Sequence, residues 1–272
     1  MKFGVRVGML AASWDGIYEQ AATLGFDGVE LEVGRDAPEQ GTPLFDPGER
    51  DNVKNRTAAC GAATSSACIG ALWKYSPASP DETLRETGLQ LVKNTITACR
   101  DLGADRILLP LSNVDQPPEV SVPRWVEFLK EASAAAQAED VVLAVEACAR
   151  PGLGTAEDLR ALVDQVGSNH VRAYFDVANL HAAGTDPVQG LGALGSEYIA
   201  IIHIKDRKKN PAGSDRAFSS CPLGEGVLDF QAITDTIREI GYDDWLVLET
   251  PGGDDRNASA KRNLEYIKAF FP

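Results

Sequence analysis

Apolar and polar residues alternate along the chain in a way that predicts eight short β-strands. Most of these runs are rich in Val, Ile and Leu, and several are almost continuously apolar, which is typical of parallel strands covered by helices. They are separated by segments with helical character. The runs comprise residues 3–9, 28–33, 62–70, 106–111, 141–147, 171–177, 198–206 and 245–251.

Three of the intervening segments carry typical helix ends: 13–25, 79–103 and 229–241. Ser13 and Asp229 are predicted N-caps, since short polar side chains satisfy free N–H groups there. The first two segments end at glycines, as helices often do. Each segment therefore predicts a helix that follows or precedes a strand.

Eight successive strand–helix units without a low-complexity linker predict one α/β domain over residues 1–272, a single (β/α)8 TIM barrel. A doubly wound open sheet is the alternative architecture. No strand followed by G-x-G-x-x-G and a helix supports the dinucleotide-binding version of that fold. The barrel is therefore the preferred prediction.

The formal net charge of −14 argues against nucleic acid and anionic membranes as partners, because both would repel such a surface. No run of 18 apolar residues predicts a membrane span. Five scattered cysteines without a C-x-x-C pair fit a reducing cytoplasm. The first apolar run contains Arg6, so it does not resemble the apolar segment of a signal peptide. We expect a cytoplasmic enzyme with a small-molecule substrate, and a homo-oligomer is left open.

Candidate chemistry gathers at the ends of the last four predicted strands, where a barrel of this kind places its active site. One metal-competent side chain ends each strand: Glu146, Asp176, His203 and Glu249. Each carboxylate alone could cap a helix or pair with a surface lysine, and a single histidine on a strand is most often a core residue. Only the joint pattern indicates a site.

Side chains alternate between the two faces of a strand, so the direction of each candidate can be checked. If His203 faces the barrel interior, Ile202 and Ile204 face the helices, as their apolar character requires. The neighbours of the three carboxylates obey the same alternation. All four candidates are therefore predicted to face one interior volume.

Three buried carboxylates in one volume would repel one another, and a divalent cation removes that cost. One imidazole with three carboxylates suits Mn²⁺, Mg²⁺ or Zn²⁺, and the hard oxygen donors favour the first two ions. Co²⁺ is a further possibility. The predicted cofactor is one divalent metal ion.

The motifs "GFDGVELEV", "FDVANLHAAGTDPV", "HIKDR", "PLGEGVLDF" and "VLETPGG" resemble the sugar-phosphate isomerase/epimerase family of xylose-isomerase-like barrels. The resemblance covers nearly the whole chain. It implies that Glu146, Asp176, His203 and Glu249 bind one ion, commonly Mn²⁺. It also implies that Glu146 and Glu249 exchange protons with a ketose or ketose phosphate.

Three positions differ from the pattern of free-ketose 3-epimerases within that family. Asn179 and Ile201 stand where those enzymes typically have histidines, and Gly152 stands where they often have a glutamate. The motifs "HIKD" and "PLGEGVLDF" are closer to the pentulose-phosphate and inositol branches. A carbohydrate substrate is expected, and neither its identity nor its phosphorylation follows from the sequence.

Four further residues are candidates for substrate contact. Asn179 is expected to bond a substrate hydroxyl. Glu30 faces inward by alternation, and either substrate contact or a structural role is open for it. Trp73 follows the third strand, where it could line the pocket or pack on a helix. Lys205 shares the inward face of His203. It opens segment 205–216, a predicted loop with a net charge of +3. Loops at this place in a barrel often bind phosphate or close over the site, and a solvated loop whose charge has no function is the alternative.

Chemically, proton removal beside a carbonyl leaves an enediolate that a divalent ion stabilises, while two carboxylates on opposite faces remove and return the proton. A keto-inositol isomerase or dehydratase would use the same metal-stabilised enediolate. An abasic-site endonuclease shares the barrel but needs several ions, and three histidines are too few. A non-catalytic binding barrel is the remaining alternative.

Overall fold

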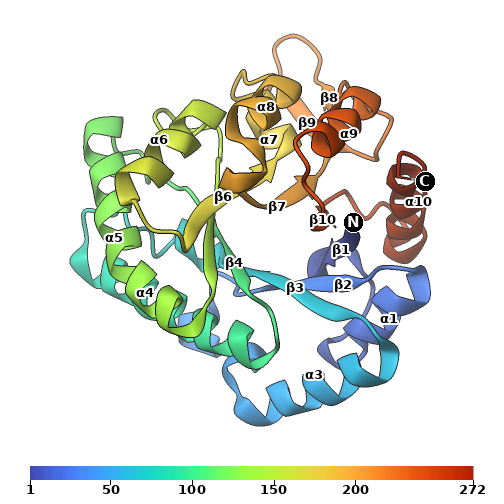
Figure 1. Cartoon of the computed structure of the whole chain (residues 1–272), viewed down its shortest axis with the longest axis horizontal. Helices are drawn as coiled ribbons and strands as arrows, with labels where there is room; N and C mark the ends of the chain where they lie inside the picture. The colour runs from blue at the N-terminus through green and yellow to red at the C-terminus, as the bar shows by residue number, and fades with distance from the viewer. Residues whose placement is uncertain (272) are drawn as a thin grey trace.

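Eight parallel strands close into a barrel in this computed structural model, which describes residues 1–271 (Figure 1). Around the barrel the order is β1-β10-β7-β6-β5-β4-β3-β2. All eight predicted strands are present, so the (β/α)8 prediction is confirmed. The strands are β1 Lys2–Arg6, β2 Gly28–Glu32, β3 Ala63–Cys68, β4 Arg106–Pro110, β5 Val142–Glu146, β6 Val171–Asp176, β7 Ile199–Ile204 and β10 Trp245–Leu248.

The helices lie outside the strands and cover the barrel (Figure 1). Short 3-10 helices occur in the connections: η1 Val7–Met9, η2 Trp14–Gly16, η3 Pro43–Phe45 and η4 Gly70–Trp73. The α-helices are α1 Ile17–Leu24, α2 Ala37–Gln40, α3 Pro47–Cys60, α4 Glu82–Asp101, α5 Pro118–Glu139, α6 Ala156–Val166, α7 Val177–Ala182, α8 Pro187–Tyr198, α9 Phe230–Glu239 and α10 Arg256–Lys268. None of the helices within residues 1–271 is long and apolar enough to cross a bilayer.

Strand alternation divides the buried residues into an outer and an inner core. Ile202 and Ile204 belong to the large outer core between strands and helices. Tyr174 and Val247 belong to a small cluster inside the barrel. This division is the one that the alternation of side chains predicts, and it leaves the inner ends of the last four strands for polar groups.

The predicted helix ends are partly confirmed. Asp229 caps α9, because its side chain accepts a hydrogen bond from the N–H of Ala232 at 3.1 Å. The prediction for Ser13 is wrong: its side chain makes no capping bond, and the chain passes through η2 before α1 begins at Ile17. The N–H of Gly16 bonds to the carbonyl of Ser13 at 3.0 Å, so Ser13 precedes a 3-10 turn and not the first turn of α1.

The charged segment after β7 forms an antiparallel hairpin, where the sequence predicted a loop. Its strands are β8 Asp206–Lys209 and β9 Phe218–Cys221. Asp206 is fully buried, and its Oδ2 accepts the N–H groups of Gly224 and Gly226 at 3.0 and 2.9 Å. A Cβ atom at Gly226 would lie 2.0 Å from Asp206 Oδ1, so only glycine allows this approach. The motifs "HIKD" and "PLGEG" are thus joined by one buried carboxylate.

Candidate metal and active site

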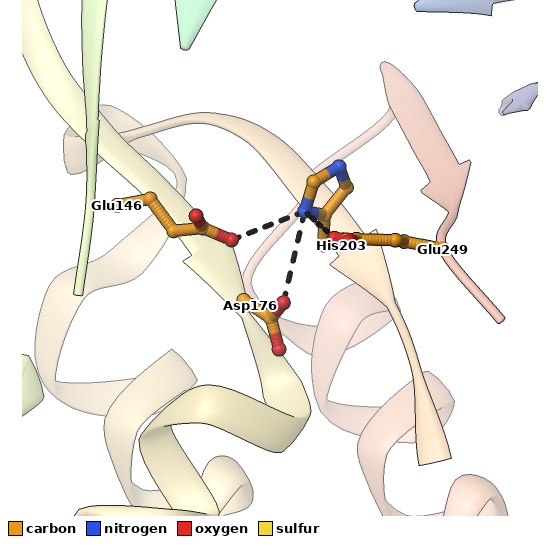
Figure 2. A group of neighbouring side chains, drawn as sticks. All are labelled: Glu146, Asp176, His203 and Glu249. Carbon is orange, nitrogen blue, oxygen red and sulfur yellow. Dashed lines mark hydrogen bonds and ion pairs between the residues drawn. The ribbon is translucent and has the colours of Figure 1, made fainter. Parts of the chain in front are cut away.

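Four side chains converge where β5, β6, β7 and β10 end (Figure 2). Glu146, Asp176 and His203 lie on β5, β6 and β7, and Glu249 directly follows β10. One ligand atom from each residue lies within 4.8 Å of the corresponding atoms of the other three. The structure therefore brings together the four residues that the sequence nominated.

His203 presents its Nδ1 atom to the three carboxylates. The distances from Nδ1 are 3.2 Å to Glu146 Oε1, 3.3 Å to Glu249 Oε2 and 3.7 Å to Asp176 Oδ2. The imidazole is fully buried. Burial opposes its protonation, but the surrounding carboxylates, Glu30 first among them, raise the pKa of His203 well above its usual range.

Asp176 has two different oxygens. Its Oδ1 caps α7 by accepting the N–H groups of Ala178 and Asn179 at 2.8 and 2.7 Å. Its buried Oδ2 accepts no hydrogen bond within the described residues and pairs with Lys205 Nζ at 3.0 Å. Burial favours the neutral acid, but the Lys205 charge and the His203 contact hold the pKa of Asp176 well below its usual range.

Glu146 and Glu249 lie on opposite sides of the His203 ring nitrogen (Figure 2). Glu146 is 6% exposed, and its Oε1 also accepts a hydrogen bond from Asn179 Nδ2 at 3.3 Å. Burial raises its pKa to about 7, against a smaller opposing effect of His203. Burial acts in the same direction on Glu249, but there Lys205, His203 and Arg6 lower the pKa to about 2.

Arg6, at the end of β1, is a site residue that the sequence reasoning missed. Its guanidinium forms ion pairs with Glu249 Oε1 and, at 3.2 Å, with Glu32 Oε1. A cation inside the first apolar strand was the available signal, because a charge at such a position needs a buried partner. The pairing leaves Glu249 Oε2 directed toward His203 and Lys205.

Glu30 lies behind the imidazole, away from the three carboxylates. It is completely buried and bonded to His203 Nε2 at 3.0 Å, Tyr174 Oη at 2.6 Å and Ser66 Oγ at 2.7 Å. The expectation that Glu30 contacts substrate does not suit this position, because every one of these partners is itself buried. Its geometry suits support of His203.

The other predicted contact residues occupy different places. Asn179 is half-buried on α7 beside Glu146. Lys205 joins Asp176 and Glu249, with Nζ 3.0 and 2.9 Å from their carboxylate oxygens. Trp73 is half-buried at the end of η4, after β3 on the same side of the barrel. The exposed charges of the hairpin, such as Lys208, lie outside this cluster.

The remaining two histidines contribute nothing to a metal cluster. His170 contacts Asp140 at 3.4 Å, and the ring of His181 packs against Phe218 with centroids 5.3 Å apart. Within residues 1–271, the group around His203 is the one set of His, Cys, Asp and Glu side chains that could hold an ion. A single-ion site fits the structure better than the several ions of a nuclease.

The donor set suits one divalent cation. Three buried or half-buried carboxylates would repel one another, and the Oδ2 of Asp176 lacks a hydrogen bond in a buried position. Carboxylate oxygens with one imidazole match the ligands that Mn²⁺, Mg²⁺, Co²⁺ and Zn²⁺ accept. The excess of hard oxygen donors over the single nitrogen favours Mn²⁺ and Mg²⁺ among these ions.

Comparisons with known proteins agree with this fold. The family model described as "Xylose isomerase-like TIM barrel" matches residues 18–270. The L-ribulose-5-phosphate 3-epimerase of Salmonella paratyphi A is 27% identical over 253 residues, covering 92% of this chain and 87% of the relative.

Two solved structures share the fold. D-psicose 3-epimerase from Clostridium cellulolyticum H10, solved with D-tagatose, has a TM-score of 0.82 at 18% identity and covers 99% of both chains. The IOLI protein, solved with a bound zinc atom, has a TM-score of 0.80 at 20% identity and covers 100% of this chain and 99% of its own.

Proposed function

Because the chain belongs to the xylose isomerase-like TIM barrel family, we propose that it is a divalent-metal-dependent sugar epimerase or isomerase. Its substrate in this proposal is a ketose or ketose phosphate. The epimerase activity of the L-ribulose-5-phosphate 3-epimerase relative supports this substrate class. All five cysteines lie within the described residues and form no disulfide. This supports a cytoplasmic location as part of the proposal.

The observation that carries the proposal is the placement of Glu146 and Glu249 on opposite sides of the candidate ion site (Figure 2). Epimerisation at carbon next to a carbonyl needs a base on one face and an acid on the other. Glu146 and Glu249 would fill these two positions. A carbonyl shift along one face would need only one of them.

Four residues would hold the ion: Glu146, Asp176, His203 and Glu249. When bound, a divalent ion supplies stabilisation for the negative oxygen of an enediolate. Asp176 would serve only as ligand, because its Oδ1 is already used to cap α7. We propose Mn²⁺ as the working ion, since hard oxygen donors outnumber the single nitrogen.

The substrate contacts follow from the same geometry. Asn179 donates to Glu146 through Nδ2, so its amide would be within reach of a substrate hydroxyl beside the carbon on which Glu146 acts. Lys205 Nζ forms ion pairs with Asp176 and Glu249 and would orient a substrate oxygen near Glu249. Trp73 would form part of the pocket wall. If the substrate carries phosphate, Arg207 and Lys208 on β8, which follow Lys205 closely in the chain, would be the candidate phosphate contacts.

The decisive experiment is proton exchange in deuterated water. Mn²⁺-loaded protein is incubated with ketoses, ketose phosphates and inosose, and deuterium in recovered substrate is measured by NMR. Incorporation next to the carbonyl, abolished by chelation and restored by Mn²⁺, is the expected result. Metal-loaded protein that incorporates no deuterium into any of these compounds would overturn the proposal and leave a binding barrel. Exchange with inosose alone would assign a cyclitol substrate.

A further inference from the structure

The His203 ring has a hydrogen-bonded, buried partner on the side that faces away from the three candidate metal-binding carboxylates. Figure 2 shows the second ring nitrogen directed away from Glu146, Asp176 and Glu249. That atom, Nε2, lies 3.0 Å from Glu30 Oε1. Both side chains are fully buried, so water cannot take the place of either partner.

Glu30 is itself held in place by two hydroxyl groups. Tyr174 Oη and Ser66 Oγ donate to its Oε2 at 2.6 and 2.7 Å. The three residues come from β6, β3 and β2, so the barrel must close before they meet. The Tyr174 ring also packs against the imidazole, with centroids 4.4 Å apart and planes at 59°. Orientation and tilt of the imidazole are both restrained.

This arrangement determines which imidazole nitrogen carries hydrogen. An ionised carboxylate only accepts hydrogen bonds. At 3.0 Å, an unprotonated Nε2 would face the lone pairs of Glu30 Oε1 and be repelled. Nε2 therefore carries the hydrogen, and in the neutral ring the lone pair belongs to Nδ1. Nδ1 is the atom that lies 3.2 to 3.7 Å from the three carboxylates.

We propose that Glu30 is a positioning residue that sets the tautomer and orientation of His203, and thereby the affinity of the site for a divalent ion. The inference rests on the metal site of the proposed function. Tyr174 and Ser66 act through Glu30 by holding its carboxylate against Nε2. A carboxylate behind a ligating histidine also makes the ring a stronger donor, and loss of such a partner typically weakens metal binding about 10- to 100-fold.

The test is metal affinity measured directly, by calorimetric titration with Mn²⁺ and Zn²⁺. Glu30→Gln preserves size and an acceptor oxygen but removes the charge, and we expect about 10- to 100-fold weaker binding. Tyr174→Phe should weaken binding in the same direction and by less. The matched control is Tyr18→Phe, since Tyr18 is an equally buried tyrosine on α1 in the outer core, where its hydroxyl contacts Thr64 at 2.8 Å.

A second readout follows the tautomer itself. With three histidines in the chain, long-range ¹H–¹⁵N spectra of the Zn²⁺-loaded protein can be assigned by His→Gln substitution at the other two. The His203 signals should show hydrogen on Nε2 in the wild type and a shifted or exchanging Nε2–H in Glu30→Gln. A merely structural role of Glu30 would lower stability without moving these signals.

The outcomes are separable. Folded Glu30→Gln with wild-type metal affinity and unchanged His203 signals would overturn the inference. If Glu30→Gln does not fold, a folded Tyr174→Phe that binds metal as tightly as Tyr18→Phe would overturn it equally. Wild-type protein that binds metal through this network but exchanges no substrate proton would refute the proposed function alone. A wild type that binds no divalent ion would remove both.

Discussion

Two glutamates of the site have the same side chain and opposite surroundings. Glu146 on β5 meets one imidazole nitrogen and one amide, and within the described chain His203 is its sole ion-pair partner. Glu249 after β10 meets Arg6 and Lys205 as well as His203. The pKa of Glu146 is raised to about 7 by burial, whereas the cations around Glu249 overcome its burial and lower its pKa to about 2.

This difference separates two tasks that one residue type can perform. Before an ion enters, Glu146 can gain or lose a proton near neutral pH, whereas Glu249 stays ionised and is held by Arg6 through one oxygen. The environment of each carboxylate, and not its chemistry, sets its suitability as acid, base or anchor. Four predictions test this contrast.

The largest effects are expected from replacing either glutamate by glutamine. Glutamine keeps an oxygen for the ion and removes the base, so Glu146→Gln and Glu249→Gln should each lower turnover about 10²- to 10⁴-fold. If the two act on opposite faces, each mutant should still exchange the proton of a different epimer, measured as deuterium incorporation. Near wild-type turnover by both metal-loaded mutants would contradict the mechanism. Loss of deuterium exchange in only one mutant would indicate an isomerase that moves the proton along one face of the substrate.

Removing a cation beside Glu249 should make it resemble Glu146. Without the charge of Lys205, the Glu249 carboxyl binds a proton at higher pH, because an adjacent cation normally lowers a carboxyl pKa by about 1 to 3 units. In metal-free Lys205→Met, the pKa of Glu249 should rise from about 2 by about 1 to 3 units, measured from its carboxyl ¹³C signal in an NMR pH titration. Arg6→Met should act in the same direction and by less. Lys208→Met is the matched control, since Lys208 is exposed and makes no ion pair in the described chain.

An unshifted Glu249 pKa in Lys205→Met would show that the contrast between the two glutamates does not depend on these cations. Equal shifts in Lys205→Met and Lys208→Met would point to general surface charge instead.

Stability of the chelator-treated protein should also report on Glu146. Its pKa is raised in the folded state from about 4.5 to about 7, so the folded state binds the extra proton between these values. Its contribution to the free energy of unfolding is therefore most favourable below pH 4.5 and declines until pH 7, by about 1–3 kcal/mol. Urea unfolding at pH 5 and 7.5 should show this decline in wild type and less of it in Glu146→Gln. An identical decline in both proteins would contradict the assignment.

The smallest effect is expected from charges that touch neither glutamate. Lys205 forms ion pairs with Asp176 and Glu249, so a substitution there would disturb more than substrate binding. Replacement of both Arg207 and Lys208 should raise KM for a phosphorylated ketose about three- to tenfold and leave kcat unchanged, since uniform binding is lost. A matching rise for the unphosphorylated ketose, or no rise for either, would exclude the hairpin as a phosphate contact.

Local patterns determined the frame of this protein. Runs of Val, Ile and Leu mark the strands. Because side chains alternate between the two faces of a strand, His203 faces the barrel interior and Ile202 faces the helices. Parallel strands of a barrel end at the same level. Residues at the ends of the last four strands therefore lie close together once the barrel forms. The ligand group could therefore be nominated from sequence.

Pairings between distant strands were decided only by the closed barrel. Arg6 on β1 reaches Glu249 because β1 pairs with β10, and Glu30 reaches His203 across the barrel interior from β2. No local pattern carries these partners, since each contact spans more than 170 residues of chain. Closure brings the first strands against the last, and the charges that then become neighbours decide which glutamate stays ionised and which imidazole nitrogen carries the hydrogen.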